Sequence, residues 1–227
     1  MAHSIMKKKL LVLSIESFSG RALCNAMNSP FYADWEIHGT WFSNLHNCSL
    51  ASSWELDVTN REAVERVISE VKPSHIINFA GWTNGSEPHM FYMVHAQGAL
   101  NILLAAKKLN TLPRILMIGT AAEYGPQESR SLPTNENQDP QPVGYYGQSK
   151  LLQSMLCRVA WLDWKLPVMI ARSFNLIGPG LPGNLAPSIF AQQIKQVLCG
   201  NQQSIQTGPL TSKRDFIDIR DAISAYL

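Results

Sequence analysis

The chain has 227 residues, of which 45% are hydrophobic and 16% are charged, and its formal net charge is +2. This composition is typical of a globular protein with a large core, and it argues against a disordered chain or a coiled coil. So small a net charge also argues against a nucleic-acid partner, because the basic run at 7–9 is isolated. The length suits one α/β domain with some chain left over.

The four cysteines are far apart in the sequence, at Cys24, Cys48, Cys157 and Cys199. No Cys-x-x-Cys pair or Cys/His cluster is present, so the sequence predicts no metal site and favours a reducing compartment. The apolar run at 10–15 is too short for a signal peptide or a membrane span. We therefore expect a cytoplasmic protein without a membrane segment.

Strands and helices are predicted to alternate along the first two thirds of the chain. Short apolar runs predict strands, and apolar residues at helical spacing predict helices. The predicted elements are a strand at 9–14, a helix at 18–27, strands at 36–43 and 54–58, a helix at 60–71, a strand at 75–81, a helix at 88–109, a strand at 114–120, a helix at 149–164 and a strand at 166–170. This alternation indicates a doubly wound, Rossmann-like parallel sheet.

The remaining segments are less regular. The polar stretch at 127–143 predicts a loop directly before the helix at 149–164, where loops commonly shape access to a site. After residue 181 the sequence predicts one helix at 187–198, a polar turn and a strand-like segment at 214–219.

The first strand-to-helix turn is the candidate phosphate-binding loop. Such a turn needs glycines, because the chain turns tightly and its backbone approaches the pyrophosphate closely. Only Gly20 is present, and Ser14 and Ser17 occupy the two earlier positions of a Gly-x-x-Gly-x-x-Gly spacing. Serine does not adopt a positive φ without cost. The helix that begins at Phe18 still offers amides and a positive dipole end to a phosphate, so Phe18 is a candidate cofactor contact together with Ser14, Ser17 and Gly20.

The next strands supply further cofactor-binding candidates. An acidic residue at the end of the second strand suits the ribose of NAD, whereas an arginine suits the 2′-phosphate of NADP. Phe42, Ser43 and Asn44 offer neither, so the choice between NAD and NADP stays open. Asp57, at the end of the third strand, either contacts adenine or caps the following helix.

The fourth strand ends at the same edge of the sheet as the first. Its last residues, Phe79, Ala80 and Gly81, are therefore candidate cofactor contacts, and Trp82 is a candidate substrate contact.

A hydroxyl residue and a Tyr-x-x-x-Lys pair suggest proton-transfer chemistry. Thr120 follows the strand at 114–120, while Tyr146 and Lys150 are four residues apart and share one face of a helix. A nearby lysine would lower the pKa of the phenol from its usual value near ~10. Thr120 would hold a substrate oxygen against the Tyr146 hydroxyl, which gives a relay for a carbonyl/alcohol couple. The alternative is that Tyr146 and Lys150 have no catalytic role and belong only to the start of an ordinary helix.

Four ordered motifs together resemble the extended short-chain dehydrogenase/reductase superfamily, in its NAD-dependent epimerase/dehydratase branch. They are Thr120-Ala-Ala-Glu-Tyr-Gly125, Tyr146-x-x-x-Lys150, Arg172-Ser-Phe-Asn-Leu-Ile-Gly-Pro179 and Lys213-Arg-Asp-Phe-Ile-Asp-Ile-Arg-Asp221. The last segment looks most like that of GDP-4-keto-6-deoxymannose reductases. Relatives carry an asparagine where this chain has His95, and they continue beyond the position of Leu227.

The resemblance implies roles for named residues. Thr120, Tyr146 and Lys150 would form the catalytic triad, and Lys150 would also bind the cofactor. Asn175 would help to seat a sugar nucleotide, and Arg214 would bind its diphosphate. A planar guanidinium matches two phosphate oxygens, and the alternative for this arginine is a salt bridge with a neighbouring aspartate, 215 or 218.

The resemblance also implies an activity. Dehydratases of this branch have acidic residues where this chain has Ala121 and Ala122, which argues against dehydration. We therefore expect NAD(P)-dependent reduction of a keto group on a nucleotide-diphosphate sugar. The alternatives are a nucleotide-sugar 4-epimerase and a non-catalytic sugar-nucleotide-binding relative whose cofactor loop has decayed.

Two statements about organisation follow from the same resemblance. Residues 1–165 would form the dinucleotide-binding domain, and residues 166–227 would supply the last sheet strand and part of a substrate-binding lobe. The helices at 88–109 and 147–164 carry extra apolar residues, including Met93, Val94, Trp161 and Trp164, and would pair with a second copy in a homodimer.

Overall fold

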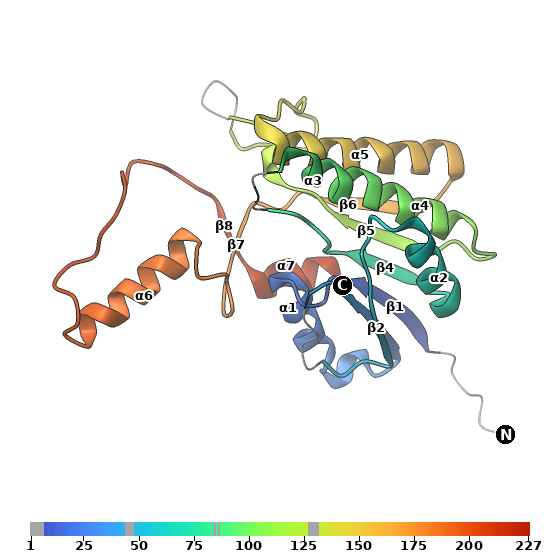
Figure 1. The fold of residues 1–227 in the computed structure, drawn as a ribbon, viewed down its shortest axis with the longest axis horizontal. Coiled ribbons are helices and arrows are strands. Elements are labelled where there is room, and N and C mark those ends of the chain that lie inside the picture. Colours follow the sequence, from blue (N-terminus) through green and yellow to red (C-terminus); the bar gives the residue numbers. More distant parts are fainter. Residues whose placement is uncertain (1–6, 44–47, 84, 86, 127–131) are drawn as a thin grey trace.

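A parallel sheet of six strands organises the chain in the computed structural model, which describes residues 7–43, 48–83, 85, 87–126 and 132–227 (Figure 1). The strand order is β3-β2-β1-β4-β5-β6. The bounds are β1 (Lys8–Leu13), β2 (Trp35–Trp41), β3 (Ser52–Glu55), β4 (His75–Asn78), β5 (Arg114–Ile118) and β6 (Val168–Ala171). The order reverses between β1 and β4, as in doubly wound sheets, so the fold prediction is confirmed.

Helices cover both faces of this sheet (Figure 1). On one face lie α2 (Arg61–Val71), α4 (Gly98–Lys107) and α5 (Gly144–Trp164), and on the other lie α1 (Phe18–Met27) and α7 (Ile219–Tyr226). Each layer buries its own apolar cluster against the strands, which explains the nearly continuous apolar runs in β1 and β4. None of the helices in the described ranges is long and apolar enough to cross a membrane.

The predicted helix at 88–109 is divided into three segments. Its first part is α3 (Pro88–Tyr92), a π-helical turn follows at Met93–Gln97, and α4 completes it. A π-helical turn holds one residue more than an α-helical turn, and such turns often occur at functional sites. Apolar spacing does not reveal the extra residue, so the sequence predicted one uninterrupted helix. His95 lies inside this turn and is fully buried.

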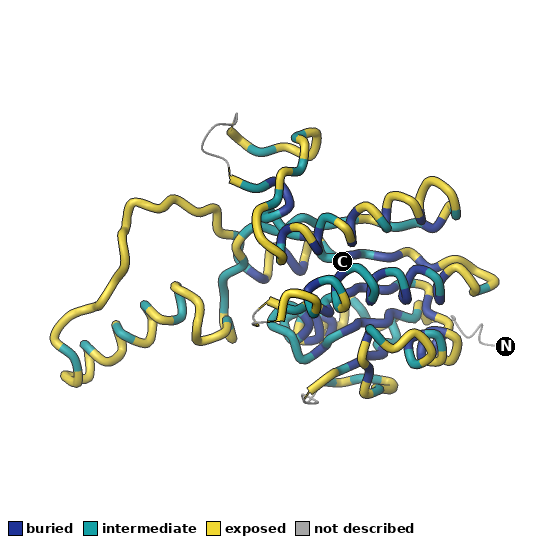
Figure 2. Tube along the Cα trace, turned by 45° about the horizontal axis from the view of Figure 1, so that its top comes forward, coloured by how far each residue is buried: buried dark blue, intermediate teal, exposed yellow. Residues whose placement is uncertain are grey.

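The C-terminal part forms a small second sheet beside the large one. β7 (Asn175–Ile177) pairs in parallel with β8 (Phe216–Asp218), and the predicted strand at 214–219 gives way to α7 at Ile219. Between them α6 (Ala186–Leu198) stands away from the main sheet, and much of its surface is exposed (Figure 2). Within the loop predicted at 127–143, residues 127–131 lie outside the described residues, and 132–143 contain no helix or strand.

Gly20 should be required for stability, because a side chain there would collide with backbone. A Cβ at this position would lie 2.4 Å from the Ser14 carbonyl oxygen and 2.8 Å from the Ile15 Cα. We expect Gly20→Ala to lower the free energy of unfolding by about 1–3 kcal/mol, measured by urea denaturation. Gly208→Ala is the control, since no heavy atom lies within 4 Å of its added Cβ. Equal midpoints for the two variants would contradict the prediction.

Candidate functional site

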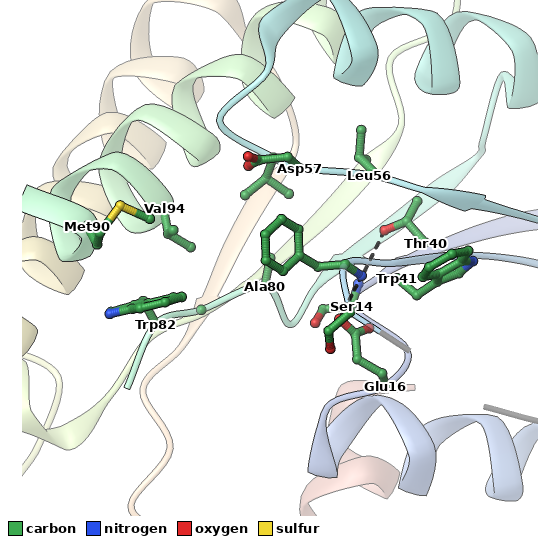
Figure 3. Close-up of a pocket in the computed structure, with 14 residues that line it drawn as sticks. Ser14, Glu16, Thr40, Trp41, Leu56, Asp57, Ala80, Trp82, Met90 and Val94 are labelled. Carbon is green, nitrogen blue, oxygen red and sulfur yellow. Dashed lines mark hydrogen bonds between the residues drawn. The ribbon is translucent and has the colours of Figure 1, made fainter. Parts of the chain in front are cut away.

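A cleft of about 220 Å³ opens at the carboxyl ends of the first four strands (Figure 3). Five residues predicted to bind cofactor or substrate line it, namely Ser14, Asp57, Ala80, Gly81 and Trp82. The other described residues that line it are Glu16, Thr40, Trp41, Phe42, Ser43, Leu56, Val58, Met90 and Val94. Its position at the strand-order reversal is where doubly wound sheets bind ligands.

The two serines of the first turn differ in conformation. Ser14 has φ of 65°, in the left-handed region that glycine adopts most easily, so the expected backbone cost applies to this residue. Ser17 has φ of −66° and caps α1, because its side chain accepts a hydrogen bond from the Gly20 N–H at 3.0 Å. The Ser17 hydroxyl also donates to the Ser14 carbonyl at 2.8 Å. Ser17 is therefore a favourable helix cap, and the expectation that both serines strain the loop is wrong for this one.

Two predicted cofactor residues are not among the described residues that line the cleft. Phe18 and Phe79 pack in the apolar cluster beneath β1, and the ring centroid of Phe79 lies 6.0 Å from that of Tyr226 in α7. Neither belongs to the residues that line the cleft, whereas Ala80 and Gly81 do.

Asp57 lines the cleft and also stabilises the turn that follows β3. Its Oδ1 accepts a hydrogen bond from the Thr59 N–H at 2.8 Å, while Asn60 is the residue that caps α2. The alternative that Asp57 caps α2 is therefore wrong, because Asp57 orders the turn before this helix and Asn60 caps it. The predicted contact with adenine is compatible with this position.

Thr120 and Tyr146 meet at the carboxyl end of β5, beyond the residues that line the cleft. The Thr120 side chain interacts with the Tyr146 hydroxyl, and the Tyr146 ring is partly buried. Burial raises the pKa of the phenol, the interaction with the Thr120 side chain opposes this rise, and the charge of Glu123 adds to it. The expected lowering of this pKa is not found, because burial dominates. A phenol with a raised pKa stays protonated at neutral pH.

Lys150 is buried on the same helix, four residues after Tyr146. Its ammonium donates to the Ile118 carbonyl at 2.9 Å and to Gln153 Oε1 at 3.3 Å. Burial lowers the pKa of Lys150 to about 8, and the Glu123 carboxylate partly offsets this effect. Two hydrogen-bond acceptors thus hold the lysine beneath β5. Because its pKa is about 8, a modest rise in pH above neutral removes its proton.

A buried carboxylate that sequence analysis did not single out holds the Thr120 turn in place. Glu123 has no exposed surface and accepts hydrogen bonds from the Thr120 N–H at 2.9 Å, the Ser154 hydroxyl at 2.7 Å and Arg172 Nε at 2.8 Å. The Thr-x-x-Glu spacing of a capping box was the signal that would have identified it.

His95 connects the cleft to the Tyr146 helix. Its Nε2 accepts a hydrogen bond from the Trp82 N–H at 2.9 Å, so this nitrogen carries no proton. Nδ1 therefore donates to the Ser149 hydroxyl at 2.8 Å, and that hydroxyl donates to the Tyr146 carbonyl at 2.9 Å. Burial, with a smaller effect of Lys150, lowers the pKa of His95 to about 3, and the ring stays neutral.

The two predicted substrate residues of the C-terminal part lie elsewhere. Asn175 begins β7, is exposed, and donates through Nδ2 to the Asp215 carbonyl at 2.8 Å. Arg214 is exposed and donates to the Lys213 carbonyl at 2.7 Å. Within the described ranges Arg214 forms no ion pair, and Asp218 pairs with Arg220 instead. The structure therefore does not bring these two residues into the cleft.

Comparison with known proteins places these features in context. The chain is 33% identical to GDP-6-deoxy-D-mannose reductase of Pseudomonas aeruginosa over 68% of its own length and 53% of that protein. It is 31% identical to GDP-6-deoxy-D-talose 4-dehydrogenase of Aggregatibacter actinomycetemcomitans, over 73% and 55% of the two chains. It therefore spans little more than half the length of these curated relatives.

A solved structure shares the fold over nearly the whole chain. The structure of RMD from Pseudomonas aeruginosa complexed with NADPH superimposes with a TM-score of 0.82 at 26% identity, over 97% of this chain and 71% of that one. The family model for NAD dependent epimerases and dehydratases matches residues 10–227. With the strand order and the cleft described above, this match shows that the chain belongs to the NAD dependent epimerase/dehydratase family.

Proposed function

We propose that this chain is part of an NAD(P)-dependent oxidoreductase that reduces a keto group on a nucleotide-diphosphate sugar. The observation that carries the proposal is the interaction of the Thr120 side chain with the Tyr146 hydroxyl at the carboxyl end of β5, with Lys150 buried four residues later on the same helix and donating to the Ile118 carbonyl of that strand. A phenol that stays protonated is a proton donor, and a hydroxyl next to it can hold the oxygen that receives the proton.

The cleft fits one half of a nicotinamide dinucleotide. Gly20 lets the start of α1 approach the end of β1 closely, and the Ser17 cap presents the N-terminal amides of this helix beside the turn. We assign Ser14, Asp57, Ala80 and Gly81 to the cofactor surface, with the backbone of Phe18 and Phe79. When bound, the dinucleotide supplies the hydride.

Three residues of the chain handle the substrate oxygen and its proton in this proposal. Thr120 holds the keto oxygen, and the Tyr146 hydroxyl donates a proton to it as the carbonyl is reduced. Lys150, charged below its pKa of about 8, stabilises the phenolate that remains. Trp82 lines the cleft, and its backbone N–H is connected through His95 and Ser149 to the helix of Tyr146.

Two features favour reduction over the other reactions of the family. Ala121 and Ala122 follow Thr120 and provide no carboxyl group for water elimination. The relatives described above are named as a reductase and a 4-dehydrogenase. A 4-epimerase is the second candidate, because UDP-glucose 4-epimerase of Mycoplasma genitalium is 28% identical over 75% of this chain.

The substrate surface and the domain division are parts of the same proposal. Asn175 and Arg214 would contact the sugar nucleotide, with residues 1–165 binding the dinucleotide and 166–227 contributing to the substrate lobe. The exposed guanidinium of Arg214 is free of carboxylates within the described ranges, which suits a diphosphate. We also propose a cytoplasmic location, since all four cysteines are free thiols.

The proposal is tested first by mass spectrometry of the nucleotide that co-purifies, and then by turnover. A reductase consumes one NAD(P)H for each GDP-4-keto-6-deoxymannose converted. A 4-epimerase interconverts UDP-glucose and UDP-galactose without net change in the cofactor. Dinucleotide binding without either reaction would favour a binding-only relative.

Tyr146→Phe should abolish turnover while cofactor binding and stability change little, because only the transferable proton is removed. We expect turnover to fall by about 10²–10⁴-fold. Tyr145→Phe is the matched control, because that neighbouring ring is exposed and should leave turnover unchanged. Damage from Tyr145→Phe together with full activity of Tyr146→Phe would show that the proton donor is assigned wrongly.

Turnover should fall as pH rises through about 8. A lysine is charged below its pKa and neutral above it, so above the pKa of Lys150, about 8, the phenolate of Tyr146 loses its stabilising cation. A pH profile of kcat in the reducing direction measures this effect. Lys150→Arg keeps its charge and should remove the fall, although its turnover will be lower. A wild-type profile that stays flat to pH 9.5 would contradict the assignment.

A homodimer is the proposed assembly, and the exposed side of α5 supports it. Leu152, Met155, Val159 and Leu162 recur at helical spacing and are 40%, 56%, 44% and 50% exposed. Trp161 and Met93 are also exposed, whereas Val94 and Trp164 pack against the core of their own chain. An apolar stripe of this length on a surface helix commonly marks a protein interface.

Met155→Glu should weaken this dimer, because it places a charge in the centre of the stripe. We expect light scattering at micromolar concentration to give a dimer mass for the wild type and a monomer mass for the variant. Leu198→Glu, on the exposed end of α6, is the control and should leave the mass unchanged. A monomer mass for the wild type would refute the proposed assembly.

A further inference from the structure

The carboxylate of Glu16 lies where the second strand meets the cofactor cleft. Glu16 belongs to the turn after β1, yet its Oε1 accepts a hydrogen bond from the Phe42 N–H at 2.9 Å, directly after β2. The side chain lines the cleft, on the side of Ser14 and opposite Trp82 (Figure 3). The carboxylate thus reaches the strand end whose own residues offer no acidic or basic group.

One oxygen of this carboxylate is free to accept hydrogen bonds from a ligand. Glu16 Oε2 is buried and has no hydrogen-bond partner among the described residues. An ionised carboxylate only accepts hydrogen bonds, and a buried acceptor without a donor is costly. Hydroxyl groups of a ligand in the cleft would satisfy this oxygen.

The charges around the cleft also favour ribose hydroxyls over a phosphate group. Asp57 provides a second carboxylate, and no lysine or arginine is found among the described residues that line the cleft. Arg21 is nearby, but its guanidinium donates to the backbone carbonyl of Glu16 at 2.6 Å and to the Gly180 carbonyl at 3.3 Å. A 2′-phosphate carries about −1.5 to −2 charges at pH 7 and would meet carboxylates here.

We propose that Glu16 is a specificity-determining residue that accepts the ribose hydroxyls of the adenosine half and makes the site prefer NAD to NADP. The proposal rests on the proposed function, since it concerns the same cofactor cleft. Glu16 would take the place of the acidic residue that NAD-binding sheets commonly carry at the end of the second strand. Because it comes from a different element, its position depends on the path of the turn after β1.

The competing explanation is that Glu16 only braces the turn through the Phe42 N–H. Glu16→Gln separates the two, because an amide oxygen can still accept that hydrogen bond while the charge is lost. A brace would leave the ratio of NAD to NADP affinities unchanged. A specificity residue would shift this ratio, with NAD bound more weakly and NADP more tightly.

The experiment is calorimetric titration of NAD⁺ and NADP⁺ into the wild type, Glu16→Gln and a control, Glu70→Gln. Glu70 is exposed in the last turn of α2, so its substitution makes the same change in net charge away from the cleft. We expect the wild type to favour NAD⁺ by about ten-fold or more, and Glu16→Gln to reduce this ratio by about ten-fold. High salt should also reduce the wild-type ratio, because it screens repulsion between the 2′-phosphate and the carboxylate.

Four outcomes would count against the inference. A wild type that binds NADP⁺ as tightly as NAD⁺ overturns it, and so does an unchanged ratio in Glu16→Gln. An equal shift in Glu70→Gln would show an effect of net charge alone. Binding of neither dinucleotide overturns the proposed function and the inference together, and this result is distinct from binding without preference.

Discussion

The ion pair between Glu123 and Arg172 is the interaction on which the arrangement of the site depends. A carboxylate without exposed surface is tolerated only when it is paired and hydrogen-bonded, and Glu123 has a cation, a hydroxyl and a backbone N–H around it. These three donors come from the segment after β6, from α5 and from the end of β5. One side chain therefore joins the Thr120 turn to the helix that carries Tyr146, and this connection keeps the Thr120 side chain close to the Tyr146 hydroxyl.

Much of the fold could be predicted because its signals are local. The apolar runs of β1 and β4 are long enough to show that both faces are covered, and α1 begins where Ser17 can cap it. The π-helical turn at Met93–Gln97 could not be predicted, since an extra residue leaves the apolar pattern readable as α-helix. The segment at 214–219 is divided between β8 and α7 at Asp218, whose side chain accepts a hydrogen bond from the Arg220 N–H and caps α7, while Ile219 packs in the core; the apolar pattern alone did not distinguish this helix start from a continuing strand.

Within the candidate site, too, the residues with a local sequence signal could be predicted, whereas those whose position depends on the path of the chain could not. Thr120, Tyr146 and Lys150 could be singled out as candidates because one hydroxyl and one helical spacing carry the signal. The loop residue Glu16 was not singled out, because its hydrogen bond to the Phe42 N–H depends on how the turn runs between two strands. The difference between Ser14 and Ser17 was also hidden, since a sequence shows two serines but not that one has a positive φ and the other caps a helix.

The π-helical turn has a consequence for how the two ends of its helix can change. One extra residue rotates everything that follows by about 100° around the helix axis. Met90, which precedes the turn, lines the cleft, whereas Ala99, Ile102 and Leu103, which follow it, belong to the core. Val94, inside the turn, contacts both. A substitution at Met90 can therefore change the surface that a ligand meets without disturbing the packing that keeps the sheet covered, whereas a substitution at Val94 changes both.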